Sequence, residues 1–330
     1  MNNLVRRSRW AAFRVFLLAS LVLFFGSLAV PDEVLIWGET RPLKWQRSVV
    51  SLWSEPLQKL SLRLPTNKVR TWFEEIIEES PSSSAVFSPA RRPESNSSSS
   101  GSSNVELVAT RLGTEIEPLK ILAVGDSLML DLQRGMERIL GSRSDVLIEG
   151  RGALGFGFVV PYWDWDDDVL PDYDQMIANI DPDVVVMMIG ANEFQGHVIE
   201  GEELRPGSNR WKEVLYGRAT EAISHFLARG ARLYWWSTPA MSDPSYLVSE
   251  LNKIWELAVG EWKPWTKTIE SMKTLGDDNG DFRWYLEKED GKLVALRKEH
   301  GVHFHEIGAD LLALQFENVL VEDGWLRVRD

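Results

Sequence analysis

The chain has 330 residues, a formal net charge of −13 and no cysteine. This length suffices for one large α/β domain with additional segments. The lack of cysteine excludes disulfides, thiolate metal sites, a cysteine nucleophile and a lipoprotein-type lipid anchor. All charged side chains in residues 1–30 are arginines, so the remainder is more acidic still and should repel phosphate backbones. We therefore expect no nucleic-acid partner.

The N-terminal stretch predicts a membrane segment. Residues 10–30 are apolar except for Arg14, and as a helix they would span roughly 31 Å, about one bilayer core. Arginines precede the stretch and acidic residues follow it. This bias predicts a single-pass anchor in the cytoplasmic membrane (residues 1–30), with the N-terminus inside and the main domain in the periplasm. A cleaved signal peptide with a small-residue site at Ser27-Leu28-Ala29 is the alternative, and it also exports the main domain.

Two segments separate this stretch from the main domain. Residues 31–79 predict amphipathic helices, which pack on the main domain or on each other, or lie against the membrane or a partner. Residues 80–104 predict a disordered linker, because twelve serines and three prolines in positions 80–103 cannot build a core. The apolar face that predicts a helix consists of Val69, Trp72, Phe73, Ile76 and Ile77.

The main domain, residues 105–330, alternates expected strands and helices. Continuous apolar strands separated by helices indicate a buried parallel sheet covered on both faces, an α/β fold of the flavodoxin-like doubly wound type. The longest stretch expected to be irregular is 150–170, whose glycines and aromatic residues favour a functional loop. The expected strands are 119–125, 145–149, 183–189 and 231–237, and the expected helices are 127–140, 172–180, 211–229, 245–260 and 307–319.

Four short motifs follow the expected strands or precede the last helix. Gly125-Asp126-Ser127 places a serine in the first turn of a helix, where N–H groups and the helix dipole favour a developing negative charge. The others are the glycine-rich loop 150–158, Gly190-Ala191-Asn192-Glu193 and His300-Gly301-Val302-His303-Phe304. Each also has a structural interpretation, as a helix cap, a tight turn or a packed histidine.

In this order the motifs resemble those of the SGNH (GDSL-type) hydrolase superfamily. More narrowly, they resemble a bacterial, membrane-anchored extracytoplasmic subgroup related to alginate-acetylation proteins. The resemblance covers residues 119–319 and implies Ser127 as nucleophile, His303 as base, and Asn192 and a glycine as oxyanion donors. We prefer Gly157 as that glycine, four residues before the proline that ends the loop, with Gly155 as the alternative. The chemistry requires no cofactor.

The chain departs from the superfamily pattern near the base. An Asp usually stands three residues before the histidine, where this chain has His300. A neutral imidazole there could accept the His303 N–H and keep its tautomer, but it supplies no negative charge. Glu299 could substitute if the turn is shifted. The usual Asp after the oxyanion Asn is Glu193, which we expect to keep a supporting role, and we expect no metal at histidines 300, 303 and 305.

Tryptophans Trp235 and Trp236 lie in a strand and are expected in the core, whereas Trp163 and Trp165 either line a substrate groove or pack inside. The leading hypothesis is an extracytoplasmic serine esterase or O-acyltransferase. It would act on acyl esters, most simply acetyl esters, of envelope or exported glycans, or on another small ester. A transferase would need a membrane partner that delivers acyl groups. The alternative is a non-catalytic glycan-binding or scaffold module that has lost the triad acid.

Overall fold

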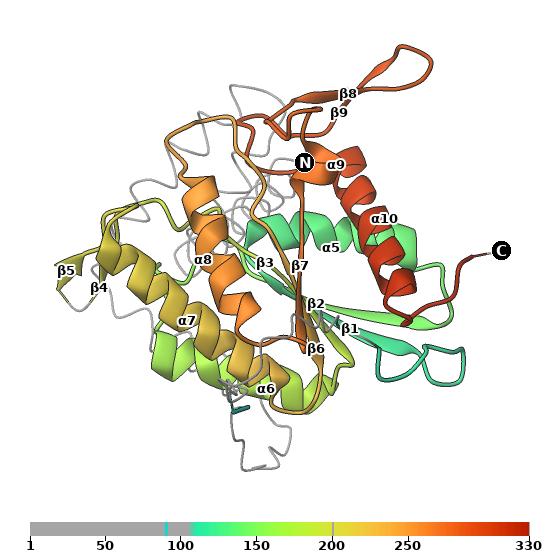
Figure 1. Cartoon of the computed structure of the whole chain (residues 1–330), viewed down its shortest axis with the longest axis horizontal. Coiled ribbons are helices and arrows are strands. Elements are labelled where there is room, and N and C mark those ends of the chain that lie inside the picture. Colours follow the sequence, from blue (N-terminus) through green and yellow to red (C-terminus); the bar gives the residue numbers. More distant parts are fainter. Residues whose placement is uncertain (1–89, 92–106, 108, 200, 330) are drawn as a thin grey trace, which may run out of the picture. The chain divides into compact units, whose positions relative to one another are not determined.

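The computed structural model describes residues 90, 91, 107, 109–199 and 201–329 (Figure 1). The predicted anchor, the amphipathic region and nearly all of the predicted linker lie outside these residues. Within the described part of the chain, no helix is both long enough and apolar enough to cross a membrane.

A five-stranded parallel sheet forms the centre of the domain (Figure 1). Its strand order, β2-β1-β3-β6-β7, is the flavodoxin-like order, so this part of the prediction is confirmed. The chain passes from β1 to β2 on one side and then to β3 on the other side of β1, so the strand order reverses between β1 and β3, the place where sheets of this type bind ligands. The strands are β1 (Leu119–Gly125), β2 (Val146–Gly152), β3 (Val184–Met188), β6 (Arg232–Trp236) and β7 (Thr266–Ile269).

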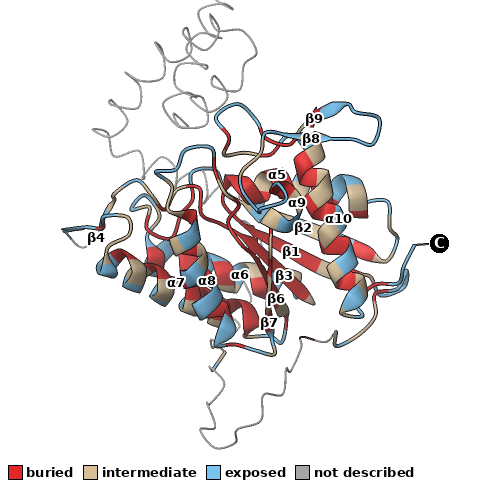
Figure 2. Ribbon diagram, turned by 45° about the horizontal axis from the view of Figure 1, so that its top comes forward, coloured by how far each residue is buried: buried red, intermediate tan, exposed pale blue. Residues whose placement is uncertain are grey.

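Helices cover both faces of the sheet (Figure 2). Because side chains alternate along a strand, Ile121 and Ala123 enter one core and Leu122 and Val124 the other. The first core lies under α5 (Ser127–Leu140) and α10 (Glu306–Glu322). The second lies under α6 (Leu170–Ile180), α7 (Asn209–Leu227) and α8 (Val248–Gly260).

Several short elements decorate this frame. A π-helical turn, η1 (Trp165–Val169), precedes α6, and α9 (Met272–Leu275) follows β7. Two hairpins project from the loops: β4 (Val198–Ile199) with β5 (Glu202–Glu203), and β8 (Tyr285–Glu287) with β9 (Leu293–Ala295). The irregular stretch expected at 150–170 is shorter than predicted, because β2 continues to Gly152 and η1 begins at Trp165.

Candidate active site

Ser127 and His303 form a hydrogen-bonded pair at the carboxyl edge of the sheet. Ser127 is the first residue of α5, directly after β1, and its Oγ lies 2.8 Å from Nε2 of His303. Burial lowers the pKa of His303, which therefore stays neutral at neutral pH. A neutral imidazole at this distance is able to take the serine proton, so the structure brings the predicted nucleophile and base together.

Asp126 fixes the position of the serine. One carboxylate oxygen accepts the Leu128 N–H at 2.8 Å, and the other accepts those of Gly190 at 2.9 Å and Ala191 at 2.7 Å. Burial raises the pKa of this carboxyl to about 6, although the backbone donors oppose the shift. The side chain caps α5 and joins it to the segment after β3, which carries Asn192.

The glycine-rich loop meets Asn192 at Gly157. A Cβ at Gly157 would lie 3.2 Å from Asn192 Cβ and 2.7 Å from Val160 Cγ2, whereas one at Gly155 would meet nothing within 4 Å. Asn192 Nδ2 donates to the Phe156 carbonyl at 2.8 Å, and an amide nitrogen carries a second hydrogen for a substrate. The geometry therefore places Gly157, the preferred glycine, beside Asn192.

Glu193 binds the backbone of the same loop. Its carboxylate accepts the N–H groups of Phe158 at 2.7 Å and Val159 at 3.1 Å, the two residues that follow Gly157. The side chain is fully buried, and burial raises its pKa to about 8. Arg218 binds the Phe158 carbonyl. The additional methylene of Glu193, relative to the usual Asp, thus reaches the backbone of the glycine loop and keeps the expected supporting role.

His300 occupies a strained turn beside the base. Its φ is +79°, its side chain is exposed, and its backbone carbonyl accepts a hydrogen bond from Ser242 Oγ at 2.8 Å. The positive form of His300 would disfavour protonation of His303, the opposite of what a triad acid does. Glu299 is also exposed. Across the described residues, no cluster of three or more His, Cys, Asp or Glu is arranged to hold a metal.

The two candidate tryptophans of the glycine loop have different environments. Trp165 is 6% exposed and packs against Phe158, with the ring centroids 5.1 Å apart. Its indole N–H donates a hydrogen bond to the Glu221 carboxylate. Of the two alternatives, the structure therefore supports packing in the core for Trp165. Trp163 is half-buried, and its ring meets that of Phe156 edge-on, with the ring centroids 5.6 Å apart. Trp235 and Trp236 are fully buried, as predicted.

Sequence reasoning missed two residues near the base. Asp131, one turn after Ser127 on α5, is buried and accepts the Phe304 N–H at 3.0 Å. Trp284, 39% exposed, lies so close to Gly301 that a Cβ there would meet its ring at 3.0 Å. Helix periodicity could have flagged Asp131 as an acidic residue on the serine's face, but no local pattern points to Trp284.

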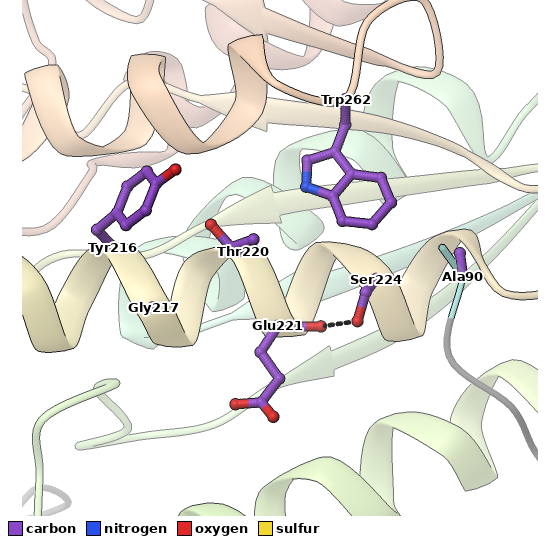
Figure 3. Close-up of a pocket in the computed structure, with 7 residues that line it drawn as sticks. All are labelled: Ala90, Tyr216, Gly217, Thr220, Glu221, Ser224 and Trp262. Atoms are coloured by element: carbon purple, nitrogen blue, oxygen red, sulfur yellow. Dashed lines mark hydrogen bonds between the residues drawn. The ribbon is translucent and has the colours of Figure 1, made fainter. Parts of the chain in front are cut away.

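A hollow of about 490 Å³ lies elsewhere, along α7 (Figure 3). Tyr216, Glu221 and Ser224 of α7 line it with Trp262, which follows α8. Figure 3 shows Ser224 bonded to the carbonyl of Glu221, a contact within the helix. None of the predicted site residues line this hollow.

The strand order, the serine at the start of α5 and its hydrogen bond to the histidine before α10 agree with the fold and the Ser–His pair that the motifs predict. The chain belongs to the family described as "Protein of unknown function (DUF459)", which matches residues 120–319. No curated protein matches the sequence.

Solved structures with a related fold include hydrolases and acetyltransferases. A lipase/acylhydrolase from Enterococcus faecalis is 16% identical, with 61% of this chain and 95% of that chain covered and a TM-score of 0.40. The C-terminal catalytic domain of a Streptococcus pneumoniae peptidoglycan O-acetyltransferase is 15% identical, covering 62% and 94%, with a TM-score of 0.36. A lipopolysaccharide acetyltransferase periplasmic domain from Salmonella ser. Paratyphi A is 14% identical, covering 62% and 84%, with a TM-score of 0.41.

Proposed function

We propose that the protein is a serine esterase or O-acyltransferase that acts on acyl esters, most simply acetyl esters, of envelope or exported glycans. The observation that carries this proposal is the 2.8 Å hydrogen bond between Ser127 Oγ and His303 Nε2. The Ser127 N–H in the first turn of α5, the Gly157 N–H and the Asn192 amide would then bind the oxyanion of the tetrahedral intermediate.

The chemistry follows from these positions. His303 takes the proton of Ser127 as Oγ attacks the ester carbonyl, and the alcohol leaves with that proton, which gives an acyl-serine. Water completes an esterase cycle, and a glycan hydroxyl completes a transferase cycle. Both require the acceptor to enter where the first alcohol left, on the side of His303.

The extracytoplasmic setting is part of the proposal. It is supported by the apolar residues 10–30, the arginines before them and the acidic residues after them. We propose a single-pass anchor in the cytoplasmic membrane with the catalytic domain in the periplasm. No thioester donor is expected there, so a transferase would receive its acyl groups from a membrane partner.

Covalent labelling of the full-length protein in detergent tests the catalytic part of the proposal. A fluorophosphonate probe should label the wild type, and Ser127→Ala should abolish labelling, because the reagent reacts with an activated serine oxygen. Ser242→Ala, which alters a serine that bonds the His300 carbonyl, is the matched control and should still be labelled. A folded wild type that resists the probe would instead support a non-catalytic glycan-binding or scaffold module.

An exposed indole supports a glycan substrate. Trp284 lies against the turn that carries His303, and tryptophan faces stack on sugar rings. Trp284→Ala should raise the KM for an acetylated oligosaccharide roughly 5- to 10-fold and leave that for 4-nitrophenyl acetate unchanged. Tyr285→Ala removes the neighbouring exposed ring on β8 and serves as control. Equal effects on both substrates would argue against a sugar site at Trp284.

A further inference from the structure

A buried carboxylate that the proposed mechanism does not use lies beside the base. Asp131 follows Ser127 by one helical turn on α5, and residues spaced in this way have Cβ atoms about 5–6 Å apart. Its side chain is buried at 6% exposure although it is ionisable. Such a group is seldom buried without partners, so its contacts indicate its role.

Those contacts join Asp131 to both ends of the turn that presents His303. One oxygen accepts the Phe304 N–H at 3.0 Å, and the other accepts from Lys298 Nζ at 2.5 Å. The Lys298 backbone N–H in turn donates to the His303 carbonyl at 2.9 Å. The carboxylate thus holds the turn at two places: at Phe304, the residue after His303, and at Lys298, five residues before His303.

The charges around His303 give Asp131 a second role. Three side chains of the same turn oppose a positive charge on the imidazole: Lys298, Arg297 and His300. Asp131 on α5 favours that charge. Arg297 is buried between the rings of Phe282 and Phe304, so its charge is poorly screened. A base that must carry a proton during acyl transfer therefore needs a compensating negative charge.

We propose that Asp131 is the positioning residue of the base: it holds the turn that presents His303 and supplies the negative charge absent at His300. This inference rests on the proposed acyl transfer. When the Ser127 Oγ–carbon bond forms, the carbonyl electron pair moves to oxygen and the Oγ proton moves to His303 Nε2. Asp131 stabilises the resulting imidazolium, and the proton then passes to the departing alcohol.

The pH dependence of fluorophosphonate labelling of the full-length protein tests this inference. Asp131→Asn keeps an oxygen for the Phe304 N–H but removes the charge. We expect the labelling rate at its plateau to fall roughly 10- to 100-fold, the effect of one charge acting over roughly 6 to 12 Å at an effective dielectric constant of about 20. The acidic limb should also move to lower pH, because the imidazolium loses its stabilising partner. Glu137→Gln removes an exposed charge from the same helix and should change neither quantity.

Two further variants separate this role from a structural one. Lys298→Met removes the cation bound to Asp131 and should move the acidic limb to higher pH, even if Asp131→Asn folds poorly. His300→Asp should restore the plateau rate of Asp131→Asn. The inference would be overturned if Asp131→Asn lowered the plateau labelling rate without moving the acidic limb of the pH profile. It would also be overturned if Lys298→Met left that limb unmoved. An unlabelled wild type would instead refute the proposed function.

Discussion

Gly157 and Gly155 differ in what surrounds their α-carbons, and this difference tests which N–H binds the oxyanion. A methyl group at Gly157 would overlap Val160 Cγ2 at 2.7 Å and press on Asn192, so Gly157→Ala must displace the loop. We expect its kcat for 4-nitrophenyl acetate to fall about 100-fold or more, the cost of losing one oxyanion donor.

Gly155→Ala is the matched variant, because the space around Gly155 is open but its φ is +70°. It should lose about 1 kcal/mol of stability through backbone strain, with a smaller effect on kcat. Steady-state kinetics and thermal unfolding of both variants make the comparison. If kcat falls more in Gly155→Ala than in Gly157→Ala, Gly155 carries the oxyanion N–H.

Single residues also mark the limit of prediction from the sequence. The motif residues Ser127, Asn192 and His303 were found because each follows a strand or precedes a helix in a recognisable order. The sequence left two environments open for Trp165, because the acidic run that follows it, residues 166–168, is also compatible with an exposed loop. In the structure Asp164 caps η1 by accepting two N–H groups of that run, and the turn directs Trp165 inward.

At the scale of single elements, the glycine-rich loop 150–158 is held in place by the buried carboxyl of Glu193. Burial raises the pKa of Glu193 to about 8 from 4.5, so the folded state holds a proton that the unfolded chain has lost. The stability contributed by the neutral form is therefore complete below about pH 4.5 and is lost as pH rises through about 8. Asp126 follows the same sign, and its contribution is lost at lower pH, as pH rises through about 6.

Chemical unfolding of the wild type and of Glu193→Gln at about pH 6.5 and about pH 8.5 measures the Glu193 contribution as the difference between the two proteins. The wild type should be less stable at the higher pH. Glu193→Gln should be less stable overall, because an amide cannot accept from both Phe158 and Val159, yet it should vary less between the two pH values. Equal pH dependence in the two proteins would show that Glu193 does not titrate in this range.

Element by element, strong apolar patterns were predicted well and weak ones were not. The boundaries of β1 and α5 were predicted correctly, since a continuous apolar strand leads directly into an amphipathic helix. Strand β7 was missed because it is an edge strand, with Thr266 and Ile269 buried and the two residues between them half-buried. The hairpin β8–β9 and helix α9 are too short to show any periodicity.

At the scale of the whole molecule, the sequence predicts that attachment and catalysis are separable. If residues 1–30 are a retained anchor, replacing them with a cleavable export signal should move the protein from the membrane to the soluble periplasmic fraction. Labelling of Ser127 should persist, because the linker 80–104 contains no core-forming pattern. Fractionation, intact mass and probe labelling measure the outcome.

A deletion within 93–103 that keeps residues 1–30 is the control and should leave the protein in the membrane. The alternative, a natural signal peptide, predicts that the wild type itself is soluble and lacks its first residues. The intact mass of the unmodified protein therefore distinguishes a retained anchor from cleavage near Ser27-Leu28-Ala29.

The three backbone contacts of Asp126 have a consequence for how the enzyme could change over time. They tie the nucleophile's helix to the segment that carries the Asn192 amide, without using any residue of the hairpin or the aromatic loops. The spacing between the serine and the Asn192 amide is therefore fixed without the surrounding loops. Segments such as β8–β9 can therefore lengthen, shorten or exchange aromatic residues without changing this spacing.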